Sequence, residues 1–261
     1  MIFPDLTQVE QIAREAGKAI MSIYIQPFEV IEKIDSSPLT MADLAANNII
    51  IERLQFYYPE IPILSEESVD SFNGANQNGF YWLVDPLDGT KEFVKRNGEF
   101  TVNIALINKG LPILGVVYAP ATDLMFSAVE GGGAFKQSND VEKQSIHIHQ
   151  HPLEPLKIVG SRSHGDENLT QWLKRFSDYE ILPMGSSLKL CLVAEGVADI
   201  YPRLGPTSLW DTAAGHIVLK EAGGYLIQLN GEEINYSNTL NLLNPYFLAI
   251  GCSSLVGSCL D

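Results

Sequence analysis

Hydrophobic residues recur along this chain at two different spacings, which predict where helices and strands form. Near the N-terminus they repeat every three or four residues, the pattern of a helix with one buried face. Thr7 and Glu10 have the spacing of a capping box at the start of that helix. A second helix is predicted over residues 41–58, where Thr40 and Asp43 again fit a capping box.

Shorter apolar runs of strand length follow. From residue 100 onward they are separated by turn residues such as Lys109-Gly110, so they predict an antiparallel meander. The second half instead alternates strands with helices. The predicted strands are residues 28–34, 61–64, 80–84, 100–108, 113–118, 125–129, 134–135, 156–160 and 198–201. The predicted helices of the second half are residues 169–176, 188–195 and 210–223.

Two further patterns have both a structural and a chemical interpretation. The three glycines at residues 131–133 resemble a phosphate cradle, but no Gly-Lys-Ser/Thr follows them, so a hairpin turn is the better interpretation. His147, His149 and His151 alternate as on one face of a strand. An exposed polar face explains them better than a metal site, because no carboxylate or cysteine joins them.

Composition narrows the classes of function. The chain has 261 residues, 46% of them hydrophobic, and a net charge of −15, so it can form one large domain or two closely packed ones. The negative charge argues against polymeric nucleic acid and anionic lipid as partners. A small anionic substrate is still compatible with this negative charge if a bound metal reverses the electrostatic field at the site. Three cysteines without metal or disulfide spacing indicate a reducing compartment.

The N-terminal segment does not have the pattern of a signal peptide. Charged residues from Asp5 to Glu15 interrupt any apolar stretch there. No window of the chain approaches the roughly 18 apolar residues that a bilayer span needs. We therefore expect a soluble protein.

The chemistry concentrates in the hexapeptide Asp85-Pro86-Leu87-Asp88-Gly89-Thr90, which follows the apolar run at residues 80–84. Two carboxylates at the mouth of a buried strand are costly to withdraw from water unless a cation neutralises them. The hexapeptide contains no basic residue, and oxygen ligands at this spacing suit Mg²⁺. Asp-Pro and Asp-Gly are also ordinary turn sequences, so the hexapeptide alone leaves both interpretations open.

Three other carboxylates stand at the ends of predicted elements: Asp43, Glu66 and Asp211. Taken singly, Asp43 and Asp211 are explained as helix caps, and Glu66, like its neighbour Glu67, as a solvated turn residue. Strand ends and helix starts of an α/β layer can converge on one edge, however. Together with the two aspartates of the hexapeptide, these residues are therefore candidates for a single site.

Three segments, in this order, resemble the inositol monophosphatase superfamily of Mg²⁺-dependent, lithium-sensitive phosphatases: Ser65-Glu66-Glu67, the hexapeptide, and Trp210-Asp211-Thr212-Ala213-Ala214-Gly215. The order and spacing match along nearly the whole chain. Within the superfamily, three details are similar to the bacterial CysQ branch of 3'(2'),5'-bisphosphate nucleotidases: Lys33-x-Asp35-x-Ser37-Pro38-Leu39-Thr40, Lys91-Glu92-Phe93, and Gly185-Ser186-Ser187-Leu188-Lys189.

The resemblance implies an α+β (mixed α/β) fold, a five-layer α-β-α-β-α sandwich of the inositol monophosphatase and fructose-bisphosphatase type. It also implies two halves. Residues 1–150 would form an N-terminal half with most of the metal ligands, and residues 151–261 a C-terminal half that completes the site. The proline-containing stretch at residues 152–155 is the expected boundary.

The resemblance further implies the metal ligands, with two and at most three Mg²⁺ per site. Glu66, Asp85 and the backbone carbonyl of Leu87 would hold one ion. Asp85, Asp88 and Asp211 would hold a second. Glu66 would also contact a third, more weakly bound ion.

Asp43, Thr90 and Glu66 are implied as the catalytic group, with Thr90 and Asp43 taking a proton from the attacking water. Lys189, Arg203 and the turn at residues 161–164 are candidates for the rest of the substrate. The residues expected to contact substrate are Glu66, Leu87, Asp88, Gly89, Thr90, Lys189 and Asp211.

The implied activity, in sulfur metabolism, removes the 3'-phosphate of adenosine 3',5'-bisphosphate to give AMP and phosphate, without a covalent phosphoenzyme. It would act similarly on 3'-phosphoadenylyl sulfate. Two alternatives stay open: a phosphatase for inositol phosphate or fructose 1,6-bisphosphate, because the acidic ligands are common to all, and a non-catalytic protein that binds a phosphometabolite. The expected location is the cytoplasm, with at most peripheral contact at the cytoplasmic face of the inner membrane.

Overall fold

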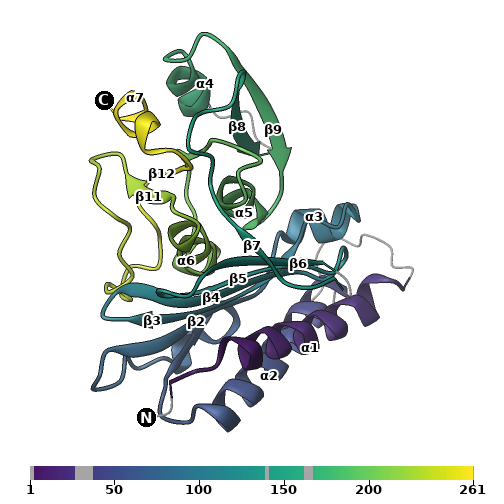
Figure 1. Cartoon of the computed structure of the whole chain (residues 1–261). Coiled ribbons are helices and arrows are strands. Elements are labelled where there is room, and N and C mark those ends of the chain that lie inside the picture. Colours follow the sequence, from purple (N-terminus) through teal and green to yellow (C-terminus); the bar gives the residue numbers. More distant parts are fainter. Residues whose placement is uncertain (1–2, 27–37, 139–140, 162–166, 261) are drawn as a thin grey trace.

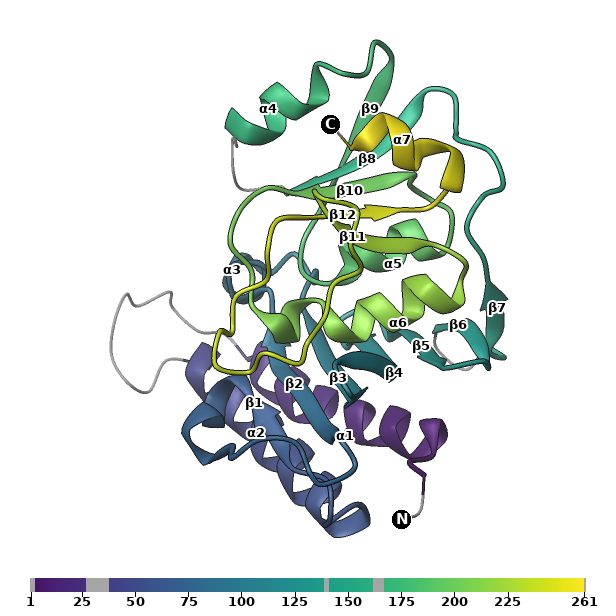
Figure 2. The same ribbon diagram turned by 90° about the vertical axis from the view of Figure 1, so that its left-hand side faces the viewer.

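The computed structural model describes residues 3–26, 38–138, 141–161 and 167–260, and these form five stacked layers (Figures 1 and 2). Helices α1 and α2 cover the outer face of a seven-stranded sheet. Helices α5 and α6 lie between this sheet and a five-stranded one, and α4 and α7 cover the far side. The predicted five-layer sandwich is confirmed. The α-helices are α1 (Leu6–Tyr24), α2 (Pro38–Tyr57), α3 (Thr90–Lys95), α4 (Glu167–Leu173), α5 (Leu188–Ala194), α6 (Ala213–Glu221) and α7 (Val256–Cys259).

The first sheet has its strands in chain order. β1 is parallel to β2, and every later pair is antiparallel, so the predicted meander is confirmed. The strands are β1 (Ile63–Ser65), β2 (Phe80–Asp88), β3 (Thr101–Asn108), β4 (Leu111–Ala119), β5 (Leu124–Val129), β6 (Gly133–Ser138) and β7 (Gln144–Ile146).

The second sheet has the order β11-β12-β10-β8-β9. Its edge strand β9 is mostly exposed, so its sequence lacks the apolar run that marks a buried strand. Three short 3₁₀ helices complete the fold: η1 (Glu66–Ser71), η2 (Leu209–Asp211) and η3 (Ser253–Leu255). The strands of the second sheet are β8 (Leu156–Ser161), β9 (Tyr179–Met184), β10 (Ile200–Arg203), β11 (Tyr225–Gln228) and β12 (Phe247–Ile250).

The start of α1 differs from the prediction. Asp5 is the N-cap, and its carboxylate accepts a hydrogen bond from the backbone N–H of Thr7 at 3.0 Å. Aspartate is among the most favourable N-cap residues. Asp5 therefore caps the helix, and the predicted capping box of Thr7 and Glu10 does not form. Glu10 is instead buried, where its carboxylate forms an ion pair with Lys143.

The second predicted capping box is also wrong. Helix α2 begins at Pro38, which suits a first helical turn because that turn has no use for its missing N–H. Thr40 and Asp43 therefore lie inside the helix. Asp43 is buried, so its side chain is withdrawn from solvent instead of capping the helix end.

The glycine stretch at residues 131–133 forms a hairpin turn between β5 and β6, as predicted. The N–H groups of Gly131 and Gly133 donate to the two carboxylate oxygens of Glu221, at 3.1 and 2.9 Å. Glu221 ends α6, so the turn ties the first sheet to the middle helical layer. The anion that these two amides bind is therefore the Glu221 carboxylate of the protein itself.

Three other expectations have separate outcomes. Residues 147–151 form no strand, so the predicted alternation of the histidines on a strand face is wrong. The strand predicted over residues 28–34 lies outside the described residues. The chain passes from the first sheet to the second between Ile146 and Leu156, and the division into halves at residue 150 stays a prediction.

Among the described helices, none has the length and apolarity that a membrane crossing needs.

Candidate active site

The first four residues of the hexapeptide, Asp85 to Asp88, do not follow β2 but form its last part. Residues three apart on a regular strand point to opposite faces. Here the pairing with β3 shifts, so that Asp85 lies opposite Asn103 and Asp88 opposite Thr101, which leaves one extra residue on β2. Such a bulge brings both aspartates to one face of the sheet.

Gly89 ends the hexapeptide's strand and caps the short helix α3. Its φ of 93° lies in the left-handed region, which side chains disfavour. A Cβ atom would also lie 2.9 Å from the carbonyl oxygen of Glu99. Glycine is therefore required where the backbone turns from Asp88 to Thr90, an exposed residue at the first position of α3.

Asp85, Asp88 and Asp211 offer one carboxylate oxygen each, and these atoms lie within 4.8 Å of one another. Within the described part of the chain, no other cluster of His, Cys, Asp and Glu side chains has this geometry. The histidines at residues 147–151 do not form such a cluster either. All-oxygen ligands at such spacing suit a hard divalent cation. The structure therefore brings together three of the four predicted carboxylate ligands.

Asp211 reaches this cluster from the second half of the chain through the 3₁₀ helix η2. Ser208 is the N-cap of η2, and its backbone N–H donates to Asp211 Oδ2 at 2.8 Å. Asp211 is thus the acidic member of a capping box and not the N-cap that the sequence predicted. This bond fixes one carboxylate oxygen while the side chain faces the other two aspartates.

Glu66 follows β1 directly and begins η1. The residue as a whole is exposed, but its carboxyl group is partly withdrawn from solvent and close enough to Asp85 for a side-chain hydrogen bond. Leu87 is buried between the two aspartates of β2, and its N–H donates to Asp85 Oδ1 at 3.0 Å. Their predicted roles as metal ligands stay predictions.

Burial and mutual repulsion raise the pKa values of Asp85, Asp211 and Glu66. Burial, followed by the charges of Asp88 and Glu66, raises the pKa of Asp85 well above its usual range. Burial and the charge of Asp88 raise the pKa of Asp211 to about 7. Burial and the charges of Glu67 and Asp88 raise the pKa of Glu66 to about 7. The protein alone cannot keep all of these groups ionised at neutral pH, so the set fits a bound cation.

Asp43 lies beside this group on α2. Burial, then the charges of Glu67 and Glu66, raises its pKa to about 8. One of its carboxyl oxygens hydrogen-bonds with Glu67, whereas Oδ1 is buried and has no hydrogen-bond partner among the described residues. An unpartnered buried oxygen beside an acidic cluster fits a bound water or ion. Its predicted pairing with Thr90 stays a prediction.

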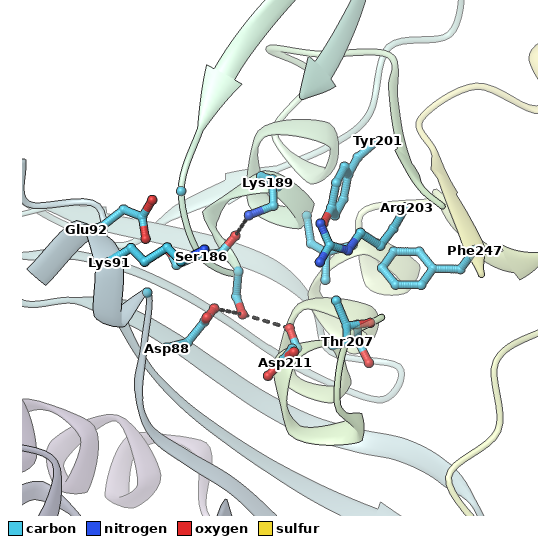
Figure 3. Close-up of a pocket in the computed structure, with 15 residues that line it drawn as sticks. Asp88, Lys91, Glu92, Ser186, Lys189, Tyr201, Arg203, Thr207, Asp211 and Phe247 are labelled. Atoms are coloured by element: carbon cyan, nitrogen blue, oxygen red, sulfur yellow. Dashed lines mark hydrogen bonds between the residues drawn. The ribbon is translucent and has the colours of Figure 1, made fainter. Parts of the chain in front are cut away.

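A cavity of about 150 Å³ adjoins the aspartates and extends into the second half of the chain (Figure 3). Three basic residues line it, Lys91, Lys189 and Arg203, beside the carboxylates of Asp88 and Asp211. The Lys189 ammonium donates to the carbonyl oxygen of Ser186 at 2.6 Å and lies 5.5 Å from the centre of the Tyr201 ring. Burial lowers the pKa of Lys189.

Arg203 faces the same cavity from β10 (Figure 3). Its guanidinium donates to the carbonyl of Pro206 at 2.8 Å. Its Nε is buried without a partner among the described residues. The rings of Tyr201 and Phe247 are buried in the cavity wall, so the cavity combines three basic side chains with two aromatic ones.

Sequence reasoning found most of this site but not all of it. Lys33, Asp35, Ser37 and the turn residues 162–164 lie outside the described residues, so the structure says nothing of them. Tyr201, Phe247, Asn103 and Thr207 were missed, because isolated residues within strands and loops carry no motif. Ser187 stood in a motif that the sequence singled out, but nothing in the pattern distinguished it from its neighbours.

Comparison with known proteins agrees with this geometry. The model of the inositol monophosphatase family matches residues 4–250. The 3'(2'),5'-bisphosphate nucleotidase CysQ of Escherichia coli K12 is 50% identical over 244 residues, which cover 93% of this chain and 98% of that protein. The nucleotidase of the same name from Haemophilus influenzae is 36% identical over 95% of this chain and 93% of that protein.

Solved structures show the same similarity. The crystal structure of CysQ from Bacteroides thetaiotaomicron, described as a bacterial member of the inositol monophosphatase family, superposes with a TM-score of 0.83. It is 38% identical, and the match covers 94% of this chain and 96% of that one. An inositol monophosphatase from Zymomonas mobilis has a TM-score of 0.80 at 21% identity, over 98% of this chain and 95% of that one, which shows a shared fold.

Proposed function

This chain belongs to the inositol monophosphatase family, and from that premise we propose that it is a magnesium-dependent 3'(2'),5'-bisphosphate nucleotidase. The reaction removes the 3'-phosphate of adenosine 3',5'-bisphosphate and releases AMP and phosphate. The same site would act on 3'-phosphoadenylyl sulfate. The observation that carries the proposal is the pocket in which Lys189 and Arg203 face the aspartate cluster.

The acidic cluster is the proposed Mg²⁺ site. Asp85, Asp88 and Asp211 would hold one ion, and Glu66, Asp85 and the carbonyl of Leu87 a second. When bound, Mg²⁺ would neutralise charge on the phosphoryl oxygens and make water more acidic. Hydrogen bonds from Leu87 N–H and Ser208 N–H hold Asp85 and Asp211 in place. The ligands therefore need little rearrangement to bind.

Thr90 and Asp43 are the proposed acceptors of the proton that the attacking water loses. Without metal, a pKa of about 8 keeps Asp43 protonated at neutral pH; a cation bound nearby would lower that pKa, and the ionised carboxylate could then accept the proton. Its unpartnered buried Oδ1 leaves room for a hydrogen bond to water or to the Thr90 hydroxyl. Thr90 is exposed at the start of α3, where its hydroxyl can meet a substrate.

A second phosphate on the substrate explains the presence of Lys189 and Arg203 in the cavity. On a protein of net charge −15, an anionic group that the metal site does not neutralise needs its own positive partners. Lys189 and Arg203 supply them, and Arg203 offers a buried N–H that no described residue accepts. Tyr201 and Phe247 are buried in the cavity wall, with 5% and 1% of their surface exposed, and contribute aromatic character to the wall against which a purine ring would lie. Inositol 1-phosphate lacks both the second phosphate and the purine ring, whereas fructose 1,6-bisphosphate lacks only the purine.

The proposed location is the cytoplasm, with no more than peripheral membrane contact. The thiols of Cys191, Cys252 and Cys259 are buried and free, which suits a reducing compartment.

Phosphate release tests the proposal on three substrates: adenosine 3',5'-bisphosphate, inositol 1-phosphate and fructose 1,6-bisphosphate. With Mg²⁺ we expect the highest kcat/KM on the nucleotide, and with EDTA no release from any of them. Asp85→Asn is the matched inactive control, since it keeps the size of the side chain and removes its charge. Fastest turnover of inositol 1-phosphate would assign the chain to the sugar-phosphate branch. Binding without turnover of any substrate would assign it to the non-catalytic class.

A further inference from the structure

Ser187 occupies the N-cap position of α5 but does not cap it. Serine at this position usually accepts a hydrogen bond from an amide of the first helical turn. Here the side chain makes no such bond. Ser187 is buried, with 4% of its surface exposed, so its hydroxyl must be satisfied elsewhere.

Three groups surround that hydroxyl, each 2.8 Å from Ser187 Oγ. They are the side-chain amide of Asn103 on β3, Oδ2 of Asp88 on β2, and the backbone carbonyl of Asp211 in η2. The dashed lines that reach Asp88 and Asp211 in Figure 3 mark two of these contacts. Ser187 thus joins both halves of the aspartate cluster from a third segment of the chain.

Proton counting determines how these groups bond. A hydroxyl donates one hydrogen, and both the carboxylate of Asp88 and the carbonyl of Asp211 can only accept. Asn103 must therefore present its NH₂ group to Ser187, because its carbonyl would compete for the single hydrogen. The Asn103 Oδ1 atom is left buried without a partner among the described residues.

The backbone around Ser187 is also fixed. The N–H of Gly185 donates to the Glu99 carboxylate at 2.8 Å, and a Cβ atom at Gly185 would lie 2.9 Å from the Glu99 carbonyl oxygen. Ser186 adopts a φ of 48°, in the left-handed region. A turn this constrained leaves Ser187 little freedom to move away from Asp88.

We propose that Ser187, oriented by Asn103, is a positioning residue of the metal site. Its single hydrogen goes to Asp88 Oδ2 in preference to the Asp211 carbonyl, because a carboxylate is the stronger acceptor. The hydroxyl thus holds Asp88 Oδ2, as Leu87 N–H holds Asp85 Oδ1 and Ser208 N–H holds Asp211 Oδ2. Each aspartate of the cluster then has one oxygen fixed by a protein donor, which orients its carboxylate toward the ion. This inference rests on the proposed metal site, but not on the identity of the substrate.

Mg²⁺-dependent thermal stabilisation tests the inference without substrate. The concentration of Mg²⁺ that gives half of the maximal rise in Tm is measured for wild type, Ser187→Ala, Ser187→Cys and Ser127→Ala. We expect Ser187→Ala to raise that concentration roughly 10- to 100-fold, the usual effect of losing such a partner. Ser187→Cys, with a weak S–H donor, should lie between alanine and wild type. Ser127 is buried to 1% exposure on β5 and does not line the pocket, so Ser127→Ala should match wild type.

A Ser187→Ala midpoint within twofold of wild type would overturn the inference, even if that variant is less stable without metal. If Ser187→Ala does not fold, the cysteine variant decides by the same criterion. At saturating Mg²⁺, Ser187→Ala should recover most of its kcat, since the defect lies in metal binding. If the Tm of the wild-type protein did not respond to Mg²⁺, that result would instead refute the proposed metal site itself.

Discussion

Removing the metal should make the stability of this protein fall as pH rises from 5 to 7. The buried carboxyl groups near the metal site have raised pKa values in the folded chain, about 8 for Asp43 and about 7 for Asp211, against a usual 3.8. Between these values the folded protein binds more protons than the unfolded chain. The resulting stability is complete below about pH 4 and is lost as pH rises toward the folded pKa values.

The magnitude follows from the linkage relation. A carboxyl group that is protonated when folded and ionised when unfolded loses about 1.4 kcal/mol of stability per pH unit. For Asp43 alone this is roughly 3 kcal/mol between pH 5 and pH 7. In a chain of this size that corresponds to a drop in Tm of roughly 6–12 °C. Saturating Mg²⁺ should remove most of the drop, because the ion stabilises the ionised carboxylates.

The assay is thermal unfolding at half-unit pH intervals, once with EDTA and once with excess Mg²⁺. Asp43→Asn, which mimics the protonated group at every pH, should flatten the EDTA curve. Glu180→Gln, at an exposed carboxylate on β9, should leave it unchanged. An EDTA curve as flat as the Mg²⁺ curve would refute the reasoning, since the site would then carry no excess of buried negative charge.

Three substitutions give further predictions. Asp85→Asn should reduce turnover at least 10³-fold, because both proposed ions would lose a ligand, and activity within tenfold of wild type at saturating Mg²⁺ would exclude the bridging role. Thr90→Ala should lower kcat by about 10²–10⁴-fold and leave the Mg²⁺ midpoint of thermal stabilisation unchanged; a shift of that midpoint would make Thr90 a support of the metal site. Lys189→Ala should raise KM for adenosine 3',5'-bisphosphate at least tenfold and barely affect inositol 1-phosphate, with Lys174→Ala, outside the pocket, as control. Equal losses on both substrates would place Lys189 at the scissile phosphate.

Most of the fold follows from patterns within single segments. The amphipathic spacing of α1 and the apolar runs of β2 to β5 are visible in the sequence, because each segment buries one face or both in a contiguous core. Cap positions were wrong where two local choices competed, as with Asp5 and Thr7. Strand β9 was missed because an exposed edge strand needs no apolar run.

The candidate site, too, was predictable only where the local sequence carries the signal. Its acidic residues stand at strand ends and helix starts, where local sequence predicts junctions, so their convergence could be anticipated. The bulge that turns Asp85 and Asp88 to one face depends on pairing with β3, which no local pattern encodes. Ser187 lies 99 residues from Asp88 and 84 from Asn103 in the sequence, so only the folded chain reveals their contacts.

The central claim is that this metal site removes the 3'-phosphate of a nucleotide bisphosphate in preference to a simple sugar phosphate. A single competition experiment tests it: equal concentrations of adenosine 3',5'-bisphosphate and inositol 1-phosphate, in one tube with Mg²⁺, followed by phosphorus NMR. The ratio of the two rates reports the ratio of kcat/KM directly, and the product spectrum shows which phosphate has left. The account predicts early loss of the 3'-phosphate signal, accumulation of 5'-AMP, and nearly intact inositol 1-phosphate. Loss of the 5'-phosphate, or consumption of inositol 1-phosphate at an equal or greater rate, would contradict it.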